Sequence, residues 1–545
     1  MAKFFLLLTM TGLLSAQPRV ETFPTKPYFR QVFQKPRTEV ELLPPVQLAE
    51  KILETMADGK PVKQLELNLR SYLELVMANN TDVAIQRLNV ETYKNAITRA
   101  FSAFDPVILA RITSGKTNSP VTSVLDSFGT TSSQTIANVS RPASFNYSQT
   151  LQEGLQINTN YTGQRSTTTS ANSLFNPLIS SNLGVNLTQP LLRNRGYYIN
   201  RIPILIARSR LKQSVFSVKS SVIGLVQNAE SAYWDAILAR DNLRVQQEAL
   251  RLATEALARA QQELDLGAMS PLDIYNPQQN KATAEISVSQ ARFTLTQRED
   301  VLRRQIGADL SPDIRVLPIK LTETVEMAID PPAVDTEAAV ERALGARPDL
   351  KGVVEAMVQD DFQIKAAVNN LRPDLSLLAS YAAYGRGGNF LTNTAGFGES
   401  LNELFAFSYP TYSFGVQLRF PVRNHSAVAD YADQLVGKKT DALTVRTTQQ
   451  QIRLDILNAA SQVESAKSSV ALAKTALDFA HKYLDAEQKK YELGTSTIYF
   501  VLQAQQSLIN ADFAVVQNTV SYRRNLLNLA AKSGTLLEDR GIALQ

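Results

Sequence analysis

The sequence predicts a mainly α-helical chain with a transmembrane β-barrel portion, built from a duplicated unit of helix, β hairpin, very long helix and helix. Three observations lead to this fold class. A glycine-centred turn occurs twice, apolar residues recur at the spacing of a coiled coil, and two segments alternate between apolar and polar residues. Together they indicate long helices joined at tight tips and strands with one apolar face.

The repeated turn lies at 264–279 and again at 491–506, with equivalent residues 227 positions apart. Gly267 and Gly494 occupy the same place in the two copies, and glycine tolerates the left-handed backbone that ends many helices. Ser270, followed by proline, fits the start of a new helix. Each copy is therefore predicted to be the tip of a helical hairpin.

Two very long helices are predicted from a 4-3 spacing of apolar residues, many of them alanine. The first series runs from Leu211 to Leu264 and is broken only by Gln246; the second runs from Ile452 to Tyr491. A spacing sustained over this length is typical of a coiled coil. Each tip should then lead into a returning helix. We expect helix boundaries at Asn200 as N-cap, Leu266, about Ala308, Ala531 and Gly534.

The β inserts are predicted at 105–190 in the first half and 373–421 in the second. Strands are expected at 107–113, 145–150, 155–161, 183–187, 375–383 and 412–420. The intervening polar stretches 114–143, 162–182 and 385–410 are expected to be loops. Because an open sheet edge is not tolerated in lipid, four to six strands from one chain require several chains to close a barrel.

These patterns divide the chain into six parts. They are a signal peptide (1–16), an N-terminal periplasmic arm (17–64), a first repeat (65–313), a Pro-rich inter-repeat linker (314–346), a second repeat (347–534) and a C-terminal tail (535–545). The signal peptide is inferred from Lys3 followed by a short apolar run and Ser15-Ala16.

Composition argues against catalysis and against nucleic acid. The net charge of +5 comes from a nearly balanced set of 56 basic and 51 acidic residues, without a basic tract. The chain has no cysteine, which excludes disulfides and thiolate metal sites. His425 and His481 have no nucleophile or ligand set beside them in the sequence. We expect no catalytic residue, cofactor or metal.

Three functional classes share parts of these patterns. A stand-alone outer-membrane porin or adhesin-like barrel would have no use for duplicated tips on such long helices. A soluble periplasmic coiled-coil scaffold is disfavoured because the chain combines a signal peptide with alternating strands, and such a scaffold would not require both. A membrane duct with a helical extension uses all of these features.

The chain resembles the TolC-like outer-membrane efflux protein family over about residues 65–534. The resemblance lies in the duplicated plan, in the two Leu-Gly tips, and in the segments that leave each β insert, Thr188–Arg193 (TQPLLR) and Arg419–Val422 (RFPV). It implies a homotrimer in the cell outer membrane with a large periplasmic portion. The implied function is a passive exit duct of a tripartite efflux or type I secretion system. The implied partners are a periplasmic adaptor (membrane fusion protein), an inner-membrane transporter and outer-membrane lipid.

The resemblance also implies a periplasmic gate. Asp273 and Tyr491 match a polar contact that closes the family's tunnel; otherwise Asp273 only caps a helix and Tyr491 only packs. Ser496, Phe500 and Gln503 stand where the family has an arginine and two aspartates. A neutral or apolar constriction, not blocked by multivalent cations, is therefore expected.

Adaptor docking is implied at both tips, although turn geometry alone would explain the two glycines. The residues concerned are Leu266, Gly267 and Ser270 in the first tip, and Leu493, Gly494 and Thr495 in the second. A group of aromatic residues fits either a membrane-interface girdle or a folded extracellular loop. They are Tyr384, Phe405, Phe407, Tyr409 and Tyr412.

Overall fold

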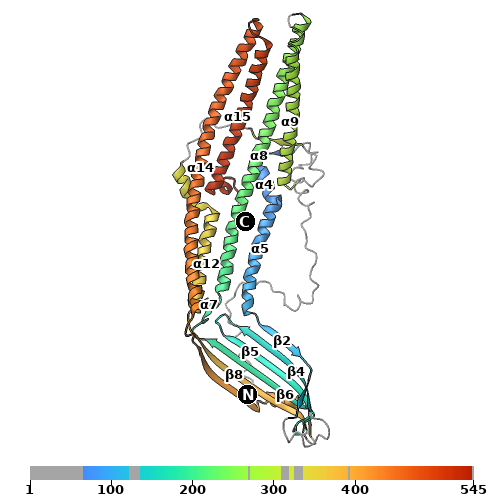
Figure 1. Cartoon of the computed structure of the whole chain (residues 1–545), viewed down its shortest axis with the longest axis vertical. Helices are drawn as coiled ribbons and strands as arrows, with labels where there is room; N and C mark the ends of the chain where they lie inside the picture. Colours follow the sequence, from blue (N-terminus) through green and yellow to red (C-terminus); the bar gives the residue numbers. More distant parts are fainter. Residues whose placement is uncertain are drawn as a thin grey trace. The chain divides into compact units, whose positions relative to one another are not determined.

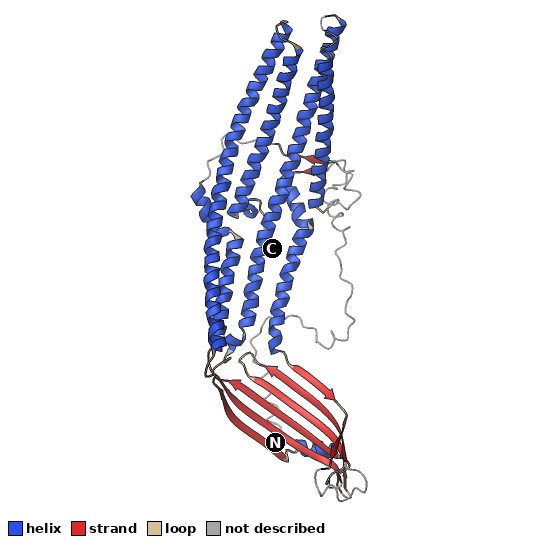
Figure 2. Cartoon of the chain, viewed as in Figure 1, coloured by secondary structure: helices blue, strands red, loops and turns tan. Residues whose placement is uncertain are grey.

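The computed structural model describes residues 65–121, 135–170, 172–267, 270–307, 318–324, 335–390 and 393–542. The predicted signal peptide and periplasmic arm lie outside the described residues. Figure 2 shows that the described strands, apart from one short pair, gather in a single sheet and that the remaining elements are helices. No described helix has the length and apolar composition that crossing a bilayer requires.

The described part of the first half contains five α-helices, of which one is very long. They are α4 (Leu69–Asn79), α5 (Thr81–Phe101), α7 (Tyr197–Asn200), α8 (Ile202–Asp265) and α9 (Tyr275–Gln305). The second half repeats the pattern with additions. Its helices are α11 (Thr336–Ala346), α12 (Pro348–Asn370), α13 (Phe397–Phe405), α14 (His425–Glu492), α15 (Ile498–Ser533) and α16 (Leu536–Asp539).

The long helices pack as two hairpins. Helix α9 lies along α8, and α15 lies along α14 (Figure 1). Contacts of α8 with α12 and α15 join the two halves, and α5 lies along α8 within the first half. The buried side chains of α8 and α14 are mostly alanine, valine and isoleucine, which lets neighbouring helices approach closely. The predicted coiled-coil helices are confirmed.

Two helix starts were predicted wrongly. Helix α8 has Arg201 at its N-cap, because the Asn200 amide instead donates to the carbonyls of Asn194 and Gly196, both at 3.0 Å. Helix α9 begins at Tyr275 and not at Ser270. The Ser270 hydroxyl accepts the Leu272 N–H at 3.3 Å, a local turn that competes with helix formation.

The main sheet is antiparallel, with the order β10-β8-β6-β5-β4-β2, and β3 and β9 pair with β4 and β8. Its strands are β2 (Val107–Ile112), β3 (Gly115–Pro120), β4 (Thr135–Thr150), β5 (Gln156–Thr168), β6 (Leu178–Pro190), β8 (Asp374–Phe390), β9 (Asn393–Ala395) and β10 (Tyr409–Arg419). Strands β2 and β3 pair with β4 in one continuous register. They are separated opposite Pro142, which has no N–H to donate, although Thr113 N–H still reaches its carbonyl at 3.0 Å.

The three stretches predicted to be loops are largely structured, so that prediction was wrong. The first contains β3 and the start of β4, and the second contains the end of β5 and the start of β6. The third contains the end of β8, the short β9 and helix α13. Their polar composition misled the prediction because one face of this sheet is mainly polar, so strand residues there resemble loop residues.

The predicted linker and tail also contain regular structure. Within the linker, β7 (Ile319–Leu321) pairs in parallel with β1 (Leu65–Leu67), and α11 packs on α14. Within the tail, α16 contacts α8 and α15. Ala343 and Leu536 are fully buried by these contacts, which the Pro-rich and terminal positions in the sequence did not suggest.

Candidate functional site at the helical tips

Both tips have the glycine-terminated geometry that the sequence predicts. Gly267 and Gly494 have φ of +73° and +71°. In the second tip, Gly494 N–H donates to the Tyr491 carbonyl and Thr495 N–H donates to the Lys490 carbonyl, each at 2.9 Å. This pair of bonds satisfies carbonyls that the helix end would otherwise leave unpaired. A left-handed residue is thus required where each long helix stops.

Each tip presents a leucine to solvent. Leu266 is 83% exposed and Leu493 is 79% exposed, while Ser270 and Thr495 are also exposed. The Thr495 hydroxyl donates to the Lys490 carbonyl at 3.0 Å and helps to fix the second turn. Two exposed leucines on rigid turns form an apolar surface that a partner could cover.

The two helical hairpins meet just behind their tips in an apolar cluster. Ile274, at the start of the first returning helix, packs with Ile498, at the start of the second, and with Ala260 of α8. Several partly buried residues complete the cluster: Leu257, Leu264, Tyr491 and Leu502. The cluster holds the two tips together within one chain.

A polar contact links the same two hairpins, but its partners differ from those predicted. The Tyr491 hydroxyl donates a hydrogen bond to a carboxylate oxygen of Glu263. The Asp273 side chain is exposed, and its backbone N–H donates to the Ser270 carbonyl at 3.0 Å. The Asp273–Tyr491 pairing is therefore corrected to Glu263–Tyr491 within the chain. Burial, followed by the Glu263 carboxylate, raises the pKa of Tyr491, so the hydroxyl keeps its proton.

Glu263 was not recognised from the sequence because it is a charged residue in a helix rich in charged residues. Its distance from Gly267 was the only available signal. Glu263 lies four residues before the first glycine, and Tyr491 lies three before the second. The last helical turns of the two hairpins therefore carry the acceptor and the donor.

The second tip contains an additional charged group at Glu487. Its side chain accepts hydrogen bonds from Lys490 Nζ at 2.6 Å and from the Ser496 hydroxyl at 3.1 Å. The bond from Lys490 lowers the pKa of Glu487, so the carboxylate stays ionised. Ser496, predicted to lie in the gate, therefore belongs to a local network that closes the turn. Glu487 was visible in the sequence as the one polar position in the apolar spacing of α14.

The two remaining residues predicted for the gate lie near the start of α15 and are exposed within one chain. Phe500 is 45% exposed, and Gln503 is also exposed. The Phe500 ring makes an edge contact with Tyr499 at a centroid distance of 5.5 Å. Neither residue brings charge, in keeping with a neutral lining.

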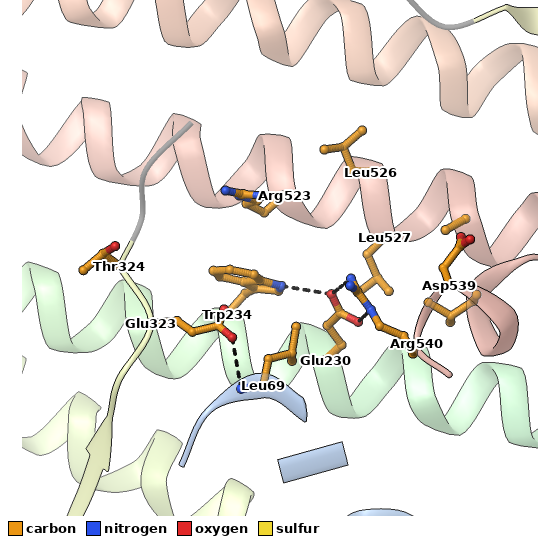
Figure 3. Close-up of a pocket in the computed structure, with 12 residues that line it drawn as sticks. Leu69, Glu230, Trp234, Glu323, Thr324, Arg523, Leu526, Leu527, Asp539 and Arg540 are labelled. Carbon is orange, nitrogen blue, oxygen red and sulfur yellow. Dashed lines mark hydrogen bonds and ion pairs between the residues drawn. The ribbon is translucent and has the colours of Figure 1, made fainter. Parts of the chain in front are cut away.

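A pocket of about 370 Å³ lies between α4, α8, α15 and α16 (Figure 3). Glu230 is 1% exposed there; it accepts from Arg540 at 2.9 Å and from Trp234 Nε1 at 3.3 Å. Glu323 accepts the Leu69 N–H at 3.1 Å. Because both carboxylates are already bonded within the chain, this pocket fastens α4 and α16 to α8 and offers no free charge to a ligand.

Among the described residues, no group of three or more His, Cys, Asp or Glu side chains is arranged to hold a metal ion. His425 is the first residue of α14, and His481 lies far along the same helix.

Comparison with known proteins identifies the family. The family model for outer membrane efflux proteins matches residues 152–308 and 339–535. The chain is 24% identical to the outer membrane efflux protein BepC of Brucella suis, over 62% of this chain and 68% of that protein. It is 26% identical to the outer membrane protein TolC of Escherichia coli, over 59% of this chain and 63% of that protein.

Solved structures show the same fold. The CmeC outer membrane channel of Campylobacter jejuni superposes with a TM-score of 0.61 at 15% identity, covering 86% of each chain. The outer membrane protein VceC of Vibrio cholerae gives 0.59 at 14% identity, covering 86% of this chain and 96% of its own. The family model matches more than half of this chain, and the protein therefore belongs to the outer membrane efflux protein family and serves as an efflux channel of the outer membrane.

Proposed function

We propose that the protein is the passive exit duct of a multi-component export system, in which three copies form one channel. The observation that carries this proposal is the pair of matching tips. Each has a left-handed glycine and an exposed leucine, and the two are linked through Glu263 and Tyr491. The duct needs no cofactor, and the energy for transport comes from an inner-membrane transporter.

Opening is proposed to occur by separation of the two hairpins behind the tips. Separation breaks the Glu263–Tyr491 hydrogen bond and exposes part of the apolar cluster around Ile274 and Ile498. A hydrogen bond to a charged group contributes roughly 1.5–3 kcal/mol, and partial exposure reduces this one to about 1 kcal/mol. That is strong enough to keep the tips together and weak enough for a partner to overcome.

The proposed role of Phe500 and Gln503 is to line the narrowest part of the closed duct. An apolar ring beside an amide resists the passage of ions mainly because an ion must lose part of its hydration shell there. Neither side chain carries a fixed charge. Divalent cations should therefore have no carboxylate ring to bind there.

Docking of a periplasmic adaptor is proposed at Leu266 and Leu493, with Ser270 and Thr495 at the edge of the same surface. Exposed leucines on otherwise polar turns fit apolar grooves in a helical partner. A stand-alone porin or a soluble scaffold would leave these leucines without a function.

Crosslinking tests the proposal. Because the chain has no native cysteine, a thiol reagent labels only the cysteine that is introduced. Ser270→Cys and Thr495→Cys, labelled with a photo-crosslinker in cells, should capture an adaptor protein. Ser468→Cys, exposed in the middle part of α14, is the matched control and should capture much less. Equal capture at all three positions would reject docking at the tips. A protein found as a soluble periplasmic species, without trimers in the outer membrane fraction, would reject the duct.

A further inference from the structure

The main sheet contains six strand positions in one chain. In spatial order they are β10, β8, β6, β5, β4 and the continuous β2–β3 segment. The first β insert supplies four of these positions, and the second insert supplies two. The two halves are therefore unequal, and the hairpin β4–β5 is the natural candidate for an addition within the first half.

One face of the sheet is predominantly apolar across all six positions. The cross-strand register joins Phe414, Ala379 and Leu187 in one row. The row continues from Leu187 through Ile157 to Gln149, and the next rows contain Tyr147 and Phe145 paired with Ile108 and Ala110. The apolar residues of this face are Tyr412, Phe414, Val416 and Leu418, then Leu375, Leu377, Ala379 and Tyr381, then Leu183, Val185 and Leu187, then Ile157 and Tyr161, then Ala143, Phe145 and Tyr147, then Ile108, Ala110 and Ile112. The polar residues on the same face include Gln149, Thr159, Ser181, Arg141 and Arg165.

The opposite face is mainly polar and continuous over the same strands. The paired residues Asn146 and Asn160 on β4 and β5 lead to Gly184 on β6. The larger apolar and aromatic exceptions on this face include Val107, Leu109, Ile136, Leu178, Leu378 and Tyr384. A two-sided pattern of this kind is what a membrane barrel with a watery interior requires. The added hairpin follows the pattern from the helical end of the sheet to Ala143 and Gly163, and the cross-strand pair Arg141 and Arg165 is the charged exception beyond that point. Over that length it has the chemistry of a wall and not of a water-exposed loop.

The strands are also long enough to cross a bilayer. Of the six positions, β10 is the shortest with 11 residues and β8 the longest with 17, and β2 and β3 together extend along β4 from Val107 to Pro120; about 9–11 tilted residues span the hydrocarbon. Within the described residues, no strand pairs with the outer side of β10 or of β2–β3. Unpaired backbone groups at such edges are not tolerated in lipid, so both edges need a partner strand.

The directions of the edge strands identify that partner. Five antiparallel steps separate β10 from the β2–β3 segment, so the two edges run in opposite directions. The β10 edge of one copy therefore faces the β2–β3 edge of the next copy in antiparallel orientation, with apolar residues on the same side. Head-to-tail pairing of this kind closes into a ring.

We propose that β4 and β5 are part of the membrane wall, so that three copies close an 18-stranded barrel by pairing β10 with the neighbour's β2–β3. The proposal rests on the trimeric duct proposed above. With strands about 4.8 Å apart and a tilt of about 40°, eighteen strands give a backbone diameter of about 36 Å. Two strands from each half of each chain would give twelve strands and about 24 Å. The wider barrel would admit a correspondingly larger cargo at the cell surface.

Thiol labelling in the lipid-embedded trimer tests the placement of the hairpin. Asn146→Cys and Asn160→Cys should react with a charged maleimide, because their side chains face the watery interior. Phe145→Cys and Tyr161→Cys, one residue away, should be at least tenfold slower, because lipid covers them. Gln417→Cys and Val416→Cys on β10 provide the matched pair of reactive and protected controls.

The result that overturns the proposal is rapid reaction at all four hairpin positions, which would place β4–β5 in water outside the membrane. Closure is tested by pairing Leu109→Cys on β2 in turn with Ser413→Cys, Gly415→Cys and Gln417→Cys on β10. At least one pair should yield disulfide-linked dimers and trimers, and no linkage from any pair would overturn the ring. If either result is obtained with an intact outer-membrane trimer, the barrel proposal is rejected but the proposed function as an export duct is not. Loss of the trimer itself would reject the proposed function.

Discussion

The hydroxyl of Tyr491 donates a hydrogen bond to the carboxylate of Glu263, and this single bond joins the last turns of two helices that belong to different repeats. The contact is half-buried and lies against the apolar cluster that contains Ile274 and Ile498. Burial raises the pKa of Tyr491, which keeps the donor proton in place throughout the neutral range. The bond therefore acts as a fixed link between the tips at physiological pH.

Removing either partner of this link should favour the open channel. Tyr491→Phe and Glu263→Gln each remove one charge-assisted bond, which we expect to contribute about 1 kcal/mol per copy at this partly exposed position. That corresponds to about a fivefold shift toward the open state. Open probability in planar bilayers is the appropriate measurement. The double variant should resemble either single variant, because both remove the same interaction.

Asp273 provides the matched control for the link. Its carboxylate is exposed and lies on the same tip, so Asp273→Asn removes a similar charge without touching the Tyr491 bond. Its open probability should remain that of the parent protein. An effect of Asp273→Asn as large as that of Glu263→Gln would show that the tip responds to total charge and not to this particular bond.

The sequence predicted one partner of the link and misplaced the other. Tyr491 was predicted from its position before Gly494, whereas Asp273 was paired with it by analogy with the family. The pairing depends on how two hairpins more than 200 residues apart in the sequence lie side by side. Glu263 is in the last turns of α8, whereas Asp273 lies ten residues further on, beyond the Gly267 turn and before α9. Helix periodicity does not determine that offset.

The fold was predictable where a periodic pattern ran for many residues. The long helices and the glycine tips follow from apolar spacing and from backbone sterics, and both agree with the structure. The strands β3 and β4 were missed in part because Pro120 and Pro142 and many Ser and Thr residues resemble a loop. Whether such a segment forms a strand depends on the residues that pair with it, and for β3 these lie 15–25 residues further along the chain.

Charge introduced at the expected constriction should create sensitivity to divalent cations. Phe500→Asp places a carboxylate where the parent has a neutral, partly exposed ring, and three copies would bring three carboxylates close together. Hard divalent cations bind such oxygen clusters. The parent should conduct equally with and without millimolar Mg²⁺, whereas the variant should be blocked. A parent channel that Mg²⁺ blocks would contradict a neutral lining at Phe500 and Gln503.

The ion pair between Arg540 and buried Glu230 should stabilise the C-terminal segment. Arg540→Ala leaves the Glu230 carboxylate buried with only Trp234 Nε1 as a partner. Loss of one partner of a buried pair costs several kcal/mol, and we expect about 2 kcal/mol here because Arg540 is about a third exposed. The fluorescence of Trp234, the only tryptophan in the chain, reports unfolding at this position.

Arg251→Ala is the control for that comparison. Arg251 pairs with Glu248 and Glu255 on the surface of α8, where all three side chains are more than half exposed. Exposed pairs contribute little to stability, so Arg251→Ala should lower the unfolding midpoint much less than Arg540→Ala. If the two variants lowered the unfolding midpoint equally, Arg540 would have no special role in fastening α16.

The left-handed glycines should tolerate a side chain poorly, although there is open space around them. Gly494→Ala forces alanine to φ near +71°, which costs about 1–2 kcal/mol in local stability. Gly437→Ala, in the interior of α14 with no atom near the added carbon, should be neutral or stabilising by up to about 1 kcal/mol. Hydrogen exchange of the Thr495 amide measures the loosening of the turn. Protection unchanged in Gly494→Ala would contradict a requirement for the left-handed residue.

The second tip should depend on pH only under acidic conditions. The hydrogen bond from Lys490 lowers the pKa of Glu487 below its usual value of about 4.3, so the stabilisation it provides is complete above that value. The stabilisation is lost as the pH falls through the lowered pKa, when the carboxylate is protonated and the bonds from Lys490 and Ser496 weaken. The mobility of a fluorophore attached at Thr495→Cys should therefore be constant from pH 7 to about pH 5 and should rise in stronger acid. Glu487→Gln should show the higher mobility at every pH, because the amide lacks the charge on which the network depends.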